Sequence, residues 1–146
     1  NRGLKISDGH PAIIKVESGQ VSQKITDALQ QPTKEGKASI DKVEITDKIL
    51  SVVGWGFLQG MDPVSQKTNV ILKKDGQELL FSVFIRERKD VTKVFGKNGI
   101  NLDSTGFMAR IPVGSLQPGT YQFGLYITNN DQKGVIYFKK SVEIIK

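Results

Sequence analysis

The chain has 146 residues, a formal net charge of +6, and 38% hydrophobic and 25% charged residues. This composition is typical of a globular protein, and the length suits one domain with an unaided hydrophobic core. The absence of cysteine excludes disulfides, thiolate zinc sites and cysteine nucleophiles. The longest apolar run, Ile49 to Leu58, is too short to span a membrane. Because the chain begins at Asn1 without a leader, we expect a processed product or a fragment.

Residues 1–37 differ from the rest of the chain. In the stretch VSQKITDALQQ (21–31), apolar residues recur at helical spacing, and Ser18 is a potential N-cap. The following stretch PTKEGK (32–37) has the composition of a linker. The sequence therefore predicts a short irregular or helical extension over 1–37 and a folded domain over 38–146.

From residue 38 onward the pattern is typical of β-strands. Apolar residues alternate with a period of two, which predicts a strand with one buried face. Seven such strands are predicted, in the segments 40–46, 49–57, 69–87 (two strands), 105–112, 120–128 and 134–145. No helix is predicted between them, so parallel pairing is excluded and an antiparallel sandwich or barrel is expected.

The segment 69–87 predicts a hairpin. Its centre holds Asp75-Gly76, a pair that suits a tight turn in which both residues have positive φ. After the turn, alternate apolar residues from Leu79 to Ile85 are expected on one strand face. Leu80 and Phe84 are expected on the opposite face, where they would form an apolar patch for a partner unless the extension covers them.

The stretch LQPGTY (116–121) favours a sandwich over a barrel. It has the form of a tyrosine corner, in which Tyr121 would donate a hydrogen bond back to the backbone upstream. We therefore expect an all-β fold: an immunoglobulin-like antiparallel β-sandwich of about seven strands.

The glycines of SVVGWGFLQG (51–60) do not form a nucleotide-binding motif. Gly54, Gly56 and Gly60 are spaced one residue too widely for a dinucleotide fingerprint, and a turn at 61–63 follows where a helix is required. The same stretch predicts close packing instead. Alternation groups the single tryptophan, Trp55, with its strand neighbours two residues away, and we expect Trp55 in the core.

The two glycines beside Trp55 are then expected to share the other face of the strand. Gly54 and Gly56 would leave a bare strip there, which allows another backbone to approach closely. We expect either the segment 1–37 or a partner protein to pack over this strip.

No constellation of catalytic or metal-ligating residues is found. The only histidine, His10, lies in the extension and cannot form a triad or a histidine metal site alone. Asp90 and Asp103 flank a long loop, as the two carboxylates of a glycosidase would, but capping of turns is the favoured interpretation. Asn98, Asn101 and Asp103 lack the spacing of a regular calcium loop. We expect no catalytic residue, no metal and no cofactor.

The loop 88–104 is longer than most connections in a compact domain and is the predicted ligand-binding site. Arg88, Lys93, Phe95 and Lys97 combine cations with an aromatic ring, which suits an acidic glycan or a nucleobase.

A structural interpretation of the same loop is favoured over the binding one. Val91, Val94 and Phe95 would close one edge of the sandwich while the lysines remain in solvent. Arg86 and Asp90 would then fix the loop through an ion pair or a turn cap.

The order of several short motifs resembles a known family. GWGF at 54–57, RKDV at 88–91, TGF at 105–107 and Leu-x-x-Gly-x-Tyr at 116–121 follow one another along the chain. They are similar to motifs of the β-sandwich accessory domains attached to bacterial membrane-bound glycosyltransferases and other surface-polysaccharide assembly proteins. The resemblance spans about residues 38–146. It implies an extracytoplasmic, non-catalytic module, at the periplasm or cell surface, tethered to a membrane protein outside this segment.

Three functions follow, in order of preference. The first is a non-enzymatic module of the bacterial cell envelope that binds or positions a glycan or docks onto a partner domain. The second is a basic nucleic-acid-binding barrel of the OB type, against which the seven strands argue, since that barrel has five. The third is a small hydrolase, for which no nucleophile or base is visible.

Overall fold

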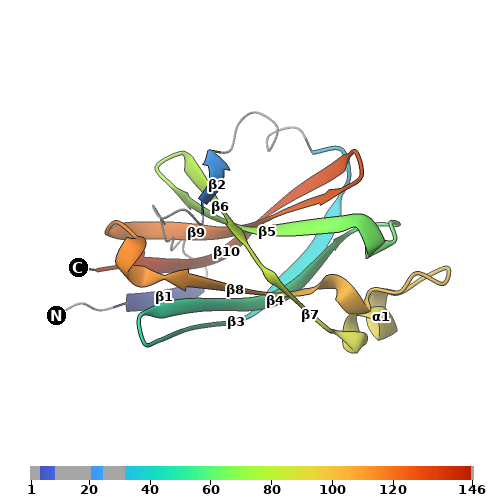
Figure 1. Cartoon of the computed structure of the whole chain (residues 1–146), viewed down its shortest axis with the longest axis horizontal. Helices are drawn as coiled ribbons and strands as arrows, with labels where there is room; N and C mark the ends of the chain where they lie inside the picture. The colour runs from blue at the N-terminus through green and yellow to red at the C-terminus, as the bar shows by residue number, and fades with distance from the viewer. Residues whose placement is uncertain (1–3, 9–20, 25–31, 146) are drawn as a thin grey trace.

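The structure is a computed structural model that describes residues 4–8, 21–24 and 32–145. These residues form two antiparallel β-sheets, sheet A and sheet B, that pack against each other (Figure 1). The predicted all-β, sandwich-like fold is therefore confirmed. Ten strands are found among the described residues where the sequence predicted seven, because three short strands were not recognised.

Sheet A has six strands in the order β1-β10-β9-β5-β6-β2. Its strands are Leu4–Asp8 (β1), Val21–Lys24 (β2), Gln66–Lys74 (β5), Gln77–Ser82 (β6), Gly119–Asn129 (β9) and Gln132–Ile144 (β10). Sheet B has four strands in the order β3-β4-β8-β7. Its strands are Gly36–Thr46 (β3), Ile49–Leu58 (β4), Phe84–Arg86 (β7) and Gly106–Pro112 (β8).

Helical structure is confined to short connections in the described part of the chain. One α-helix, Lys89–Phe95 (α1), lies between β7 and β8 at one end of sheet B (Figure 1). Three single turns of 3-10 helix occupy Pro63–Ser65, Asp103–Thr105 and Val113–Ser115. No helix of the described residues has the length and apolarity needed to cross a bilayer.

Both predicted turn motifs are confirmed. The hairpin β5–β6 turns at Asp75 (φ 52°) and Gly76 (φ 77°), the positive values that a tight two-residue turn requires. The hydroxyl of Tyr121 donates a hydrogen bond of 2.9 Å to the carbonyl oxygen of Gln117, which closes the tyrosine corner.

The single strand predicted after the hairpin is wrong, because the chain changes sheets there. β6 ends at Ser82 in sheet A, and β7 begins at Phe84 in sheet B and crosses the sandwich diagonally (Figure 1). The predicted Leu80–Phe84 patch therefore does not form: Leu80 is buried on sheet A, whereas 63% of Phe84 is exposed on sheet B. The alternation of apolar residues continues from β6 into β7, so the sequence gives no sign that the chain crosses to the other sheet.

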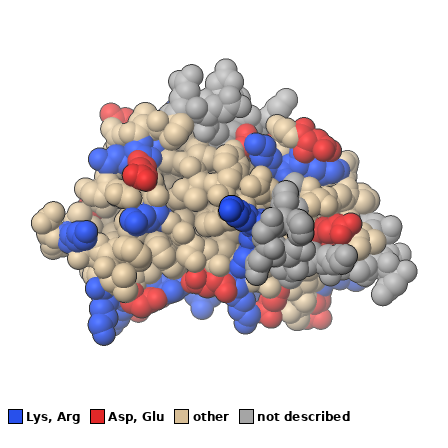
Figure 2. Space-filling view, turned by 180° about the vertical axis from the view of Figure 1, so that it is seen from behind, with Lys and Arg blue, Asp and Glu red and all other residues tan. Residues whose placement is uncertain are grey.

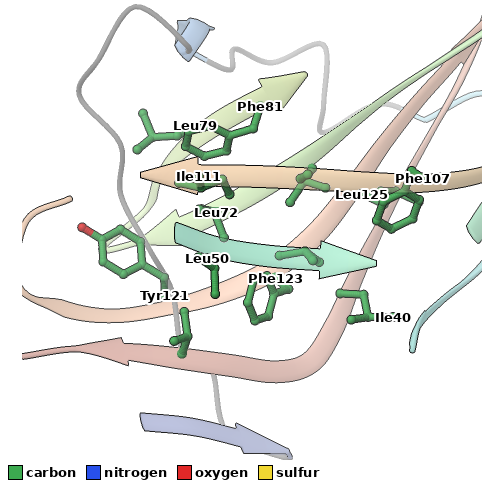
Figure 3. Close-up of a cluster of buried hydrophobic side chains, with 14 of the residues drawn as sticks. Ile40, Leu50, Leu72, Leu79, Phe81, Phe107, Ile111, Tyr121, Phe123 and Leu125 are labelled. Atoms are coloured by element: carbon green, nitrogen blue, oxygen red, sulfur yellow. The ribbon is translucent and has the colours of Figure 1, made fainter. Parts of the chain in front are cut away.

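The core lies between the two sheets. Alternate side chains of both sheets meet there and are almost completely buried, Tyr121 and Phe123 among them (Figure 3). Sheet B contributes Leu50, Phe107 and Ile111 to the same cluster. Full burial of a side chain of this size contributes about 2 kcal/mol to folding.

The predicted helix of the extension is wrong at its start. Val21–Lys24 is the strand β2, which pairs with β6, and the remainder of that prediction (25–31) lies outside the described residues, as does His10. β1 pairs with β10. The first strand of sheet B begins at Gly36, and the domain boundary near residue 38 stays a prediction.

Charge is distributed over the surface in separate groups. Figure 2 shows one face of the molecule, on which Lys and Arg lie in several places with Asp and Glu between them and uncharged residues in the middle. On this face the net charge of +6 is not concentrated in one continuous basic patch.

Candidate functional site

The outer face of β4 carries an aromatic cluster of Trp55, Phe57 and Phe95. The ring centroids of Trp55 lie 5.8 Å from Phe57 and 5.2 Å from Phe95, and those of Phe57 and Phe95 are 5.8 Å apart. Val91 and Leu102 are buried in the same cluster. The helix α1 and the residues after it thus form an additional layer over this end of sheet B.

The prediction that Trp55 lies in the core between the sheets is wrong. Trp55 faces outward and is half-buried beneath Phe95, whereas Gly54 and Gly56 face the core. The close approach predicted at the glycines does occur, but the sheets themselves make it. A Cβ on Gly56 would collide with the side chain of Leu125 of sheet A.

Arg88 fixes the start of the 88–105 segment. Its guanidinium donates to both carboxylate oxygens of Asp90, with an ion-pair distance of 2.8 Å, and to Asp41 of β3 at 2.7 Å. The hydrogen bonds from Arg88 hold the pKa of Asp90 below its ordinary value. Asp90 was predicted to fix the segment, but its partner is Arg88; Arg86 instead contacts the Sδ atom of Met108 at 3.7 Å.

Thr92 fixes the other end of the segment. Its hydroxyl donates to Asp103 at 2.5 Å and accepts a hydrogen bond of 2.8 Å from the backbone N–H of Leu102. Asn101 accepts a hydrogen bond of 2.8 Å from the backbone N–H of Asp103. These oxygens are used in turn formation, and no cluster of three or more His, Cys, Asp or Glu side chains suited to a metal is found in the described part of the chain.

Phe57 and Phe95 of the aromatic cluster form part of the wall of a small hollow, which we name the α1 groove. Its volume is about 160 Å³, less than the roughly 300 Å³ at which ligand pockets usually begin, so it would hold only part of a ligand. Its lining consists of Lys37, Phe57, Gln59, Gly60, Met61, Phe95, Lys97, Asn98, Ile100 and Leu102.

The α1 groove combines an apolar floor with a cationic and amide rim. Phe57, Phe95 and Ile100 supply apolar surface, and the ammonium of Lys37 lies 5.6 Å from the centroid of the Phe95 ring. A cation at this distance is attracted to the face of the ring. Lys97 and Asn98 are exposed at the rim and can donate hydrogen bonds to a ligand.

The structure separates the four predicted site residues. Phe95 and Lys97 line the α1 groove together. Arg88 does not line it and is engaged with two carboxylates, and Lys93 is exposed on α1 outside the groove. In the packing alternative, Val91 is buried as expected, whereas Val94 is 66% exposed.

Sequence reasoning missed the contribution of β3 and of the β4 end to the groove. Lys37 stands next to Phe57 because these two residues are partners in the β3–β4 ladder. Gln59 follows directly after β4. Only strand register could have revealed either residue, since both lie far from the loop in sequence.

The polar side chains that line the α1 groove are the ammonium groups of Lys37 and Lys97 and the amides of Gln59 and Asn98. The described residues of this lining include no carboxylate, imidazole or hydroxyl group. Asp90 and Asp103, considered as a carboxylate pair, are bonded to Arg88 and Thr92. Comparison of the chain with protein-family models, with curated proteins and with solved structures finds no match.

Proposed function

We propose that the chain is a non-catalytic module of the bacterial cell envelope, on the extracytoplasmic side, whose α1 groove binds an acidic group of a glycan. The observation that carries this proposal is the ammonium of Lys37 over the Phe95 ring, with Lys97 in the lining of the same groove. An aromatic face with flanking cations and an amide suits a ligand that is part apolar, part hydroxylated and negatively charged.

Each part of the groove has a counterpart in such a ligand. The C–H face of a sugar ring would pack on Phe95, and the hydroxyl groups would accept from or donate to Asn98 and Gln59. A carboxylate or sulfate on the sugar would lie between Lys37 and Lys97, where a charge-assisted hydrogen bond is stronger than a neutral one. The small groove volume fits the recognition of one residue of a longer chain.

The scaffold supports the same proposal. We infer that the sandwich is of the immunoglobulin-like kind, on the strength of the hydrogen bond from Tyr121 to Gln117 that closes its tyrosine corner. The order of the motifs at 54–57, 88–91 and 105–107 resembles that of accessory domains in polysaccharide assembly. Phe57 of the first of these motifs lines the α1 groove and Trp55 packs against Phe57, which supports a role of this motif in forming the site.

The test compares two lysines of the same segment. Acidic and neutral oligosaccharides are titrated into the wild type and into the variants Lys97→Gln and Lys93→Gln by isothermal titration calorimetry. We expect Lys97→Gln to weaken binding of the acidic sugar about tenfold, the equivalent of one charge-assisted hydrogen bond. Lys93→Gln removes the same charge four residues away, outside the groove, and should change the affinity less than about twofold.

Three results would contradict the proposal. One is the absence of binding to any acidic oligosaccharide at low salt, where electrostatic attraction is strongest. Another is an equal effect of both lysine variants, which would indicate attraction by net charge alone. The third is tighter binding of a single-stranded oligonucleotide with a steep salt dependence, which would favour the nucleic-acid alternative.

A further inference from the structure

The outer face of sheet B has a second hollow, lined by other residues than the α1 groove. It has a volume of about 420 Å³, within the range of pockets that hold small ligands. All four strands of sheet B contribute to its lining, which shares no residue with the α1 groove. We name it the sheet B hollow.

Strand register places three cations around an apolar floor in this hollow. Val53 and Met108 are partners in the β4–β8 ladder and form the floor. Lys42 is the partner of Val53 on the β3 side. Arg86 reaches over Met108 from β7, with its Nη1 atom 3.7 Å from the sulfur, and Arg110 follows Met108 on the same face of β8.

The arginines and the lysine of the hollow differ in their ion pairs among the described residues. Lys42 is paired with Glu44 at 3.2 Å, on the β3 side. No carboxylate of the described residues lies within ion-pair distance of Arg86 or Arg110. Their planar donor arrays match the oxygens of phosphate, sulfate or carboxylate groups, which accept two parallel hydrogen bonds from one arginine.

Neutral donors complete the hollow. Ser51 lies on the floor strand and is the ladder partner of Arg110, and Thr46 lies at the β3 side. Glu44 and Asp47 also line the β3 side, so that the negative charges lie there and the guanidinium groups on the β7–β8 side. An anion would therefore be attracted to the β7–β8 side and repelled from the β3 side.

We propose that the sheet B hollow is a binding site for a tetrahedral oxyanion, a phosphate or sulfate group, held by Arg86 and Arg110. The group is either free in solution or carried by a sugar, and its chemistry at the two arginines is the same in both cases. This site does not depend on the function proposed for the α1 groove, because the two hollows use different residues.

The test is a titration of isotopically labelled protein with sodium phosphate, with sodium sulfate and with a hexose phosphate, followed by nuclear magnetic resonance at constant ionic strength. We expect saturable shifts of the amide signals of Val53 and Met108. In the double variant Arg86→Gln/Arg110→Gln the affinity should fall about a hundredfold, since each arginine supplies about a tenfold effect.

A matched control removes two charges from sheet A instead. Lys67 and Lys139 are exposed on β5 and β10, and the variant Lys67→Gln/Lys139→Gln should bind like the wild type. All three proteins should show the same dispersion of amide signals, which establishes that each is folded.

Each outcome bears on the proposal. Tighter binding of the hexose phosphate than of inorganic phosphate indicates a group carried by a sugar, and equal binding indicates that the free ion suffices; both support the site. Shifts that do not saturate, or equal affinities of the wild type and the double arginine variant, would overturn it.

Discussion

The two faces of β4 differ in a way that explains the site. The face toward sheet A carries Leu50, Val52, Gly54, Gly56 and Leu58, all buried. The opposite face carries the aromatic residues, which need the additional layer of α1 to be covered. Space decides which face is the inner one: side chains of sheet A fill the volume above Gly56, and the neighbouring strands of sheet B leave no room for a Cβ on Gly54. The largest side chain of a strand therefore does not by itself mark the interior.

The largest effect is expected on the inner face. In the variant Gly54→Ala the new Cβ would collide with the carbonyl oxygen of Ser39 and approach Phe107 to 3.0 Å. Because a backbone oxygen cannot move out of the way cheaply, we expect a loss of about 3 kcal/mol in the free energy of unfolding. Thermal and urea denaturation would measure it, with the melting temperature lowered by roughly 10 °C.

The control for this variant is Gly114→Ala. Nothing lies within 4 Å of a Cβ on Gly114, and its φ is not positive. Its effect should stay within about 0.5 kcal/mol. If Gly54→Ala were equally mild, the close approach of the neighbouring strands β3 and β8 to Gly54 would be wrong.

A smaller and more local effect is expected on the outer face. Trp55→Ala would remove one of the two ring partners of both Phe57 and Phe95, at a cost of about 2 kcal/mol because Trp55 is only half-buried. Hydrogen exchange should become faster in α1 and stay unchanged in β9. Equal acceleration in both would mean that the outer layer and the core unfold as one unit.

The smallest effect is expected on the stability of the protein at low pH, through the Arg88–Asp90 ion pair. In the folded protein the pKa of Asp90 is lowered by Arg88, so this pair stabilises the fold fully above the ordinary carboxyl pKa of about 4. That contribution is lost as the pH falls through the lowered pKa. Arg88→Gln should therefore reduce the melting temperature slightly at neutral pH and make it less sensitive to pH below about 4.

A wild type and an Arg88→Gln variant with identical acid unfolding curves would show that the ion pairs do not hold the outer layer. Asp41→Asn serves as a second variant, since Asp41 is the other carboxylate partner of Arg88. The Asp41→Asn variant should keep the lowered pKa of Asp90, because the hydrogen bonds from Arg88 to Asp90 remain.

Features that depend on residues close together in the chain could be predicted from the sequence. The turn at Asp75-Gly76 and the tyrosine corner at Tyr121 depend on residues close together in the chain, and both are present. Most strands of the sandwich could also be located, because each carries its own period of two. Phe95 and Lys97 were predicted as binding residues on the same local basis; both line the α1 groove, and their role in binding stays a prediction.

Features that depend on distant residues could not be predicted. Alternation separates the faces of β4 but does not say which one meets sheet A, so Trp55 was assigned to the wrong side. The crossing between sheets at Val83 leaves the alternation intact. The arginines of the sheet B hollow, Arg86 and Arg110, come together only through the pairing of β7 and β8 with their neighbours.

The pairing of β1 with β10 and of β2 with β6 means that both edges of sheet A are formed by the first 24 residues. An open edge presents unpaired N–H and C=O groups that can recruit a strand from another molecule. Two short strands at these positions protect the longer strands β10 and β6 from such contacts. The segment that composition sets apart thereby supplies both edge strands of sheet A.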